Sequence, residues 1–178
     1  MWSNIFRAAG GHVIPLKDIS NGGAPVILSG GVSTVLPDMD TSLGGVAMFI
    51  DSKCKSQSVV WRKTGQVRHG IDRRNYQAYL KAAEIFKKRC GIAVVELFQQ
   101  CGVLWSGSLL IERLDDLGAP FEGDSNQSHM VYWPRKSFRD IDSVSPLGLW
   151  QIARGIKKPD YRTFLDLVFC PVKQVHLF

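Results

Sequence analysis

Residues 44–53, GGVAMFIDSK, place an apolar run directly before the acid and base of an Asp-Ser-Lys sequence, Asp51 and Lys53. Successive side chains of a strand point to opposite faces, so Asp51 and Lys53 are expected on one face. Residues 32–38, VSTVLPD, predict a preceding strand that ends at Asp38, and the intervening MDTSLGG suits a hairpin loop. Two neighbouring strands of this kind would bring two carboxylates within several ångströms of each other.

The remaining pattern predicts an α/β fold with a mixed central sheet flanked by helices, its first strands antiparallel. The clearest helix starts at Asp72, a plausible N-cap, and stops at Gly91. Its apolar residues recur at three-and-four spacing, at Tyr76, Tyr79, Leu80, Ala83 and Phe86. Further strands are expected at 13–16, 25–30, 58–63, 92–98 and 129–133, and further helices at 108–118, 135–141, 146–155 and 160–169.

Composition indicates one globular domain over residues 1–178, because 45% of the residues are hydrophobic and 21% are charged. No apolar run reaches the roughly 18 residues that span a bilayer, and the N-terminus lacks the order of a signal peptide. The four cysteines form no C-x-x-C pair, which favours reduced thiols. We therefore expect a cytoplasmic protein without a membrane partner.

The two carboxylates predict a site for a divalent cation. Unpaired neighbouring anions repel each other and need a cation or a raised pKa. Mg²⁺ prefers oxygen ligands, and Asp38, Asp51, the backbone carbonyl of Ser52 and water would supply them. Asp40 lies on the same strand face as Asp38 and could replace or assist it. Lys53, one pleat beyond Asp51, would orient the attacking water or stabilise negative charge.

This arrangement resembles the PD-(D/E)xK nuclease superfamily, which contains restriction-endonuclease-like and Holliday-junction-resolvase-like enzymes. The matching residues are Pro37-Asp38, then Asp51-Ser52-Lys53 after an apolar strand, then the helix from Asp72, within residues 30–98. The resemblance implies a restriction-endonuclease-like fold, Mg²⁺ bound by Asp38 and Asp51, and a catalytic role for Lys53. It also implies a polar helix residue facing the site, for which Gln77 is the best match.

The sequence departs from the superfamily pattern in two ways. The segment SNIFRAAGG contains no acidic residue, whereas many members carry one on an N-terminal helix. The second acid of the motif is Asp rather than the commoner Glu. Together these departures favour one metal ion over two, with Mn²⁺ as the expected substitute for Mg²⁺. Either Glu96, in an apolar strand, or Glu112 is a candidate for the missing third acid.

Basic residues next to the proposed site predict a nucleic-acid surface. The net charge is +6, and the segment from Lys53 to Arg74 contains no acid before Asp72. A second basic segment follows Trp133, where residues at a helix N-terminus attract phosphate. The candidate DNA contacts are Lys55, Arg62, Lys63, Arg68, His69, Arg73, Arg74, Lys81, Arg135 and Lys136.

The leading hypothesis is a Mg²⁺-dependent deoxyribonuclease that hydrolyses phosphodiester bonds and acts as a homodimer on two strands. Three alternatives stay open at this point. Asp51 could form an ordinary surface salt bridge with Lys53 or Lys55 in an unrelated α/β domain. The chain could be a nucleic-acid-binding protein that kept the fold and lost the reaction. It could also be a protein-interaction module whose basic surface meets an acidic partner.

Overall fold

The computed structural model describes residues 1–20, 25–29, 31–55, 59–61, 64–97, 99–100, 103–104, 107–123, 129–144, 151 and 154. Its helices are α1 (Trp2–Ala8), α2 (Leu16–Ile19), α3 (Arg73–Phe86), α4 (Leu114–Leu117) and the 3₁₀ helix η2 (Arg135–Ser137). Its strands are β1 (His12–Pro15), β2 (Val26–Ser29), β3 (Val32–Val35), β4 (Met39–Leu43), β5 (Val46–Lys55), β6 (Val59–Val60), β7 (Val67–Asp72), β8 (Arg89–Glu96), β9 (Gln99–Gln100), β10 (Val103–Leu104), β11 (Gly107–Arg113), β12 (Phe121–Glu122), β13 (Met130–Pro134) and β14 (Arg139–Val144).

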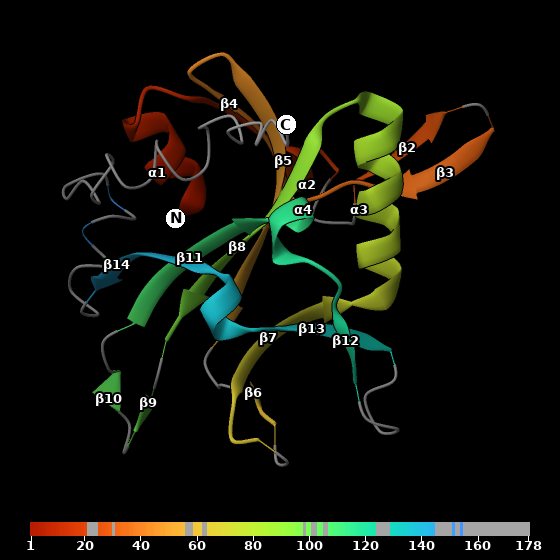
Figure 1. Cartoon of the computed structure of the whole chain (residues 1–178). Coiled ribbons are helices and arrows are strands. Elements are labelled where there is room, and N and C mark those ends of the chain that lie inside the picture. Colours follow the sequence, from red (N-terminus) through yellow and green to blue (C-terminus); the bar gives the residue numbers. More distant parts are fainter. Residues whose placement is uncertain are drawn as a thin grey trace, which may run out of the picture.

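A six-stranded main sheet with the order β1-β4-β5-β8-β11-β14 forms the centre of the described structure (Figure 1). Strands β5 and β8 are parallel and joined through α3, whereas the other neighbours are antiparallel. A second, four-stranded antiparallel sheet has the order β12-β13-β7-β6. The predicted α/β fold with a mixed central sheet and flanking helices is therefore confirmed.

Two apolar cores cover the two faces of the main sheet. On one face, α1 packs through Trp2, Ile5 and Phe6 onto buried side chains of β4, β5, β8 and β11. On the other face, Phe49 of β5 belongs to a cluster that also contains residues of α3, β7 and β13. In Figure 1 the main sheet accordingly runs between α1 and α3. The proposed metal ligand Asp51 lies on the α3 side of the sheet. It is two residues beyond Phe49 in β5, so the two side chains point to the same face.

The α3 helix begins as its sequence predicts. The Asp72 carboxylate accepts a hydrogen bond of 2.7 Å from the Arg74 amide, which satisfies one of the free donors at the helix start. The expected stop at Gly91 is wrong. The helix ends at Phe86, because Lys87 takes a left-handed conformation with φ 51°, and Gly91 lies within β8. Leu80, expected on the apolar face, is 42% exposed.

The sequence predicts the wrong partner strand for β5 in the hairpin before Asp51. Residues 39–43, expected in a loop, form β4 and pair with β5 across a turn at Gly44 and Gly45. Both glycines have positive φ, which suits a two-residue hairpin turn. The 32–35 strand instead pairs with β2. Although MDTSL contains polar residues, every second side chain of β4 is buried, namely Met39, Thr41 and Leu43.

Two predicted helices are strands. Residues 107–113 form β11 between β8 and β14, and only the single helical turn of α4 follows. Residues 135–137 form one 3₁₀ turn before β14 instead of a helix through 141. Residues 108–178 are expected from the sequence to form a helical C-terminal elaboration, but their described part adds strands to both sheets. The helices expected at 146–155 and 160–169 fall outside the described residues, apart from positions 151 and 154.

The predicted strand at 92–98 is β8, and the predicted strand at 129–133 is β13. Strand β6 covers only Val59 and Val60 of the expected 58–63. In the part of the chain that the structure describes, no helix is both long and apolar enough to cross a membrane.

Candidate active site

The register of β4 and β5 brings Asp38 next to Asp51. Met39 pairs with Ile50, so one further step along both strands places Asp38 opposite Asp51. Side chains of directly opposite residues lie on the same face of an antiparallel pair. The negative charge of Asp38 acts on Asp51 and contributes to the raised pKa of the Asp51 carboxyl. The Asp38 carboxylate therefore lies near enough to Asp51 for its charge to act on it, although Asp38 precedes β4 rather than ending β3.

Asp38 is fixed in place by Ser52. The Ser52 amide and hydroxyl both donate to Asp38 Oδ2, at 3.0 Å and 2.9 Å. The Asp38 carbonyl in turn accepts from the Lys17 amide at 3.3 Å. These bonds occupy Oδ2 and leave Oδ1 without a donor among the described residues. Ser52 thus orients a carboxylate, and ligation by its backbone carbonyl stays a prediction.

Asp51 is fully buried, and only one of its two carboxylate oxygens accepts hydrogen bonds from the described residues. Its Oδ1 accepts from Lys53 Nζ and from the Tyr79 hydroxyl, each at 2.8 Å. Its Oδ2 has no hydrogen-bond partner among the described residues, and the residue is 0% exposed. Burial raises the pKa of the Asp51 carboxyl, although the Lys53 charge works in the opposite direction. An unpaired buried carboxylate oxygen is costly, so the site favours a cation.

Lys53 and Lys55 carry positive charge along the same face of β5. The Lys53 side chain is 27% exposed and reaches Asp51 from the solvent side, as the alternation of the strand predicts. Burial lowers the pKa of Lys55, and the neighbouring Lys53 charge lowers it further. The two lysines thus form the solvent-facing edge of the site, in position to meet an anionic group that approaches the two carboxylates.

The helix residue that reaches the site is Tyr79, not Gln77. Gln77 is exposed, and two positions along a helix rotate a side chain by roughly 200°. Tyr79 is 3% exposed and donates to Asp51. Burial and the charge of Asp51 raise the pKa of the Tyr79 hydroxyl, which stays protonated as a donor. The helical spacing predicts that Tyr79 lies on the buried face of the helix. It does not predict that the Tyr79 hydroxyl contacts Asp51.

Asp40 is engaged elsewhere. Its Oδ1 accepts from Lys88 Nζ, and the same ammonium lies 4.6 Å from the centre of the Phe49 ring. Asp40 pairs with Phe49 across the strands, one pleat away from the position opposite Asp51. This ion pair compensates the Asp40 charge within the protein. Of the two acids that the sequence offered for this role, Asp38 is the one beside Asp51.

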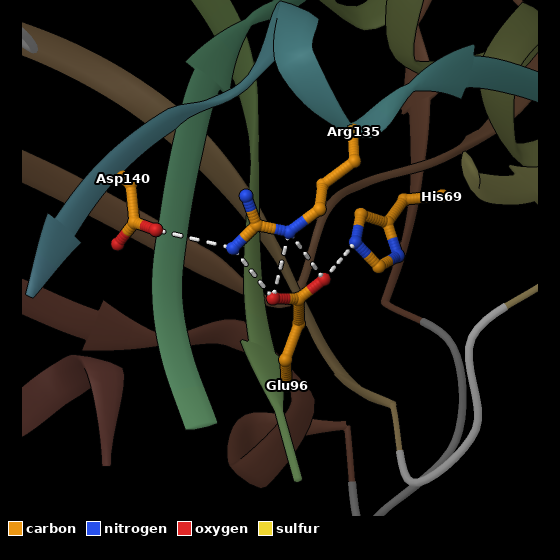
Figure 2. Close-up of polar contacts among 4 residues, drawn as sticks. All are labelled: His69, Glu96, Arg135 and Asp140. Carbon is orange, nitrogen blue, oxygen red and sulfur yellow. Dashed lines mark hydrogen bonds and ion pairs between the residues drawn. The ribbon is translucent and has the colours of Figure 1, made fainter. Parts of the chain in front are cut away.

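Glu96 and His69 belong to a separate buried network (Figure 2). His69 Nε2 and Glu96 Oε1 lie 2.6 Å apart, and both residues are buried. The Arg135 guanidinium donates to both oxygens of Glu96 and to Asp140. His69 and Arg135 thus help to pack β7 and η2 against β8. Both side chains are engaged within the protein, whereas the sequence predicts that they contact DNA phosphates. Glu112 is likewise paired, with Arg139 at 2.7 Å.

The other predicted DNA contacts divide between buried and exposed positions. Arg68 is 5% exposed, with its guanidinium carbon 3.6 Å from the Trp61 ring centre, rather than at the surface. Arg73 pairs with Glu122 at 2.8 Å. The exposed ones are Arg74, Lys81 and Lys136. Arg62 and Lys63 lie outside the described residues.

The residues present fit one hard divalent cation. Asp38 and Asp51 each have one oxygen that no donor among the described residues engages, Oδ1 of Asp38 and the buried Oδ2 of Asp51. Oxygen ligands of this kind suit Mg²⁺, which keeps several of its waters. The described residues contain no group of three or more His, Cys, Asp or Glu side chains that could hold a metal. The geometry therefore fits a two-carboxylate site completed by water and substrate.

Comparison with known proteins finds similar chains among the solved structures. No protein family model matches the chain, and no curated protein matches its sequence. Among solved structures, a Holliday junction resolvase (Hjc) from the archaeal hyperthermophile Archaeoglobus fulgidus is similar, with a TM-score of 0.45 and 12% identity. The likeness covers 86% of this chain and 95% of that chain. The function proposed below rests on the geometry of the site.

Proposed function

We propose that the protein is a Mg²⁺-dependent deoxyribonuclease that hydrolyses phosphodiester bonds. The observation that carries the proposal is the buried Oδ2 of Asp51, which has no partner in the described part of the chain and lies near Asp38 and beneath a lysine on the solvent side. A carboxylate that is 0% exposed, with one oxygen that no donor among the described residues reaches, favours a positive ligand from outside the chain. Two neighbouring acids and a lysine are the groups that metal-assisted phosphoryl hydrolysis needs.

In this proposal Asp38 and Asp51 hold Mg²⁺, with Mn²⁺ as a substitute. When bound, the ion supplies a Lewis acid that activates water and offsets charge on the phosphate. Ser52 keeps one oxygen of Asp38 occupied, so that its other oxygen faces the ion. The Lys53 ammonium stabilises the negative charge that develops on the phosphate, because it reaches the same spot from solvent.

The proposed substrate is DNA, gripped through its phosphates by the exposed basic residues. Arg74, Lys81 and Lys136 are exposed, and Lys55 lies on the same strand face as the site. Contacts of this kind bind the backbone independently of base identity and weaken as salt rises. We propose that two copies act together on duplex substrates, because each cut needs one site.

The test is nicking and linearisation of plasmid DNA in Mg²⁺, with Mn²⁺ as a parallel condition. We expect Asp51→Asn and Lys53→Met each to lower the cleavage rate by roughly 100-fold, the usual cost of losing one transition-state contact. Asp18→Asn, which removes an exposed carboxylate from α2, is the control and should cut like the wild type. Equal cutting by all four proteins, or cutting that persists in EDTA, would contradict the proposal. DNA binding without any cleavage would favour a non-catalytic binding protein.

A further inference from the structure

We propose that Tyr79 is a positioning residue that keeps Asp51 turned toward the metal ion. This inference rests on the proposed function, since it assigns a role within the same site. The Tyr79 hydroxyl donates to Asp51 Oδ1 at 2.8 Å, and Oδ2 of the same carboxylate is the oxygen left for the cation. Tyr79 would not touch the metal or the substrate, and it would act only through Asp51.

The two Asp51 oxygens differ in their hydrogen bonds. Lys53 Nζ and the Tyr79 hydroxyl both donate to Oδ1, so two donors share one oxygen, and no donor from the described residues reaches the other. The terminal torsion of an aspartate is broad and roughly two-fold, so a free carboxylate has little preference between its oxygens. Two donors on one oxygen remove this symmetry and leave Oδ2 as the available ligand.

The two donors differ in how firmly they are held. Lys53 is a long side chain, 27% exposed, and in the proposed reaction it meets the phosphate. Tyr79 is 3% exposed and belongs to the apolar cluster between the main sheet and α3. While Lys53 contacts the phosphate, Tyr79 is the donor that remains on Oδ1. The orientation of Asp51 during the reaction would therefore depend on the helix residue rather than on the lysine.

The backbone around Tyr79 is fixed from two directions. The Cys90 thiol of β8 donates to the Tyr79 carbonyl at 3.3 Å, and the Thr34 hydroxyl of β3 donates to the Ala78 carbonyl at 3.3 Å. Side chains of two strands thus bond adjacent carbonyls of α3. This anchoring limits sliding of the helix over the sheet, so the hydroxyl keeps its place above β5. Such outer partners of metal ligands commonly affect metal affinity by roughly 10- to 100-fold.

The test measures Mn²⁺ affinity on DNA-free protein by isothermal titration calorimetry, with Tyr79→Phe as the variant. This change removes the hydroxyl alone, and we expect the Kd for Mn²⁺ to rise about tenfold. Tyr76→Phe is the matched control, because Tyr76 lies on the same helix with its ring centre 5.5 Å from that of Trp133. It should bind Mn²⁺ like the wild type. Lys53→Met should also retain affinity, because Tyr79 still holds Oδ1 and one positive charge near the ion is gone.

The outcomes separate this inference from the proposed function. If wild type binds Mn²⁺ and Asp51→Asn does not, but Tyr79→Phe binds within twofold of wild type, the positioning role is wrong and the metal site stands. If wild type and Asp51→Asn bind Mn²⁺ equally, the metal site itself is wrong. Calorimetry reports affinity per folded molecule, so a loss of fold in Tyr79→Phe lowers the number of sites and leaves Kd interpretable. Should no sites remain, Tyr79→Phe must still unfold cooperatively in urea, and a variant that is already unfolded would show that the hydroxyl serves the fold and would overturn the inference.

Discussion

At the scale of single residues, Gly70 shows how closely β7 and β13 are packed. A Cβ added at Gly70 would lie 2.5 Å from the Tyr132 ring and 2.5 Å from the Val131 carbonyl oxygen. The ring could turn aside, but the carbonyl belongs to the strand backbone and cannot. We expect Gly70→Ala to lower the free energy of unfolding by about 1–3 kcal/mol, the usual cost of overpacking. Urea denaturation would measure it, with the exposed Ser33→Ala as control, and an unchanged midpoint would contradict the packing described.

The residues of the candidate site differ in how far the sequence predicts them. Strand alternation places Asp51 and Lys53 on one face, because that relation is local and depends only on the two-residue period. The contact between Tyr79 and Asp51 joins residues 28 positions apart. It depends on the rotation of α3 over the sheet, which the helix pattern alone leaves open. The pattern identified a buried tyrosine, and only packing revealed which carboxylate its hydroxyl meets.

At the scale of elements, the Glu96 network joins three parts of the fold. Glu96 on β8 bonds His69 of β7 and Arg135 of η2, so it links the main sheet to the second sheet (Figure 2). Burial opposes ionisation of Glu96, but the hydrogen bonds from His69 and Arg135 outweigh it and lower the pKa. A buried carboxylate held in this way is expected to stabilise the docking of the two sheets while it is charged.

We expect Glu96→Gln to lower the free energy of unfolding by roughly 3 kcal/mol near neutral pH, because Arg135 loses its main partner. A lowered pKa means that the unfolded chain binds the proton more tightly. The stabilisation is therefore complete above the unfolded value of 4.5 and is lost as the pH falls below it. Urea titrations at several pH values would measure this. A difference between wild type and variant that did not shrink in acid would contradict the assignment.

The elements that the sequence mispredicts share a physical cause. The segment SLLIERLDDL carries apolar residues at a spacing that suits a helix, yet β11 lies between β8 and β14 with both faces covered. A strand buried on both faces shows no two-residue alternation, so its pattern cannot be separated from that of a helix. By contrast, α3 shows the three-and-four spacing of its own helix, and the prediction of a helix there is correct in type.

At the scale of the whole molecule, the site is expected to cost stability in the absence of its cation. Asp51 is buried, one of its oxygens has no partner where the structure is described, and burial raises its pKa, so the folded state disfavours the charged form. We expect Asp51→Asn to raise the free energy of unfolding in EDTA by roughly 1 kcal/mol, since functional groups often reduce stability. An amide of the same shape keeps an oxygen for Tyr79 and carries no charge to bury.

Addition of Mg²⁺ should reverse the order of the two proteins. A ligand that binds only the folded state stabilises it by mass action, by about 1.4 kcal/mol at ten times its Kd. Wild type would gain this amount, and Asp51→Asn would gain almost nothing because one of its two carboxylate ligands is lost. Thermal unfolding in EDTA and in Mg²⁺ would measure both proteins, with Asp18→Asn responding like the wild type. A wild type that is indifferent to Mg²⁺, or an Asp51→Asn variant stabilised equally, would leave the buried carboxylate without the cation that its environment favours.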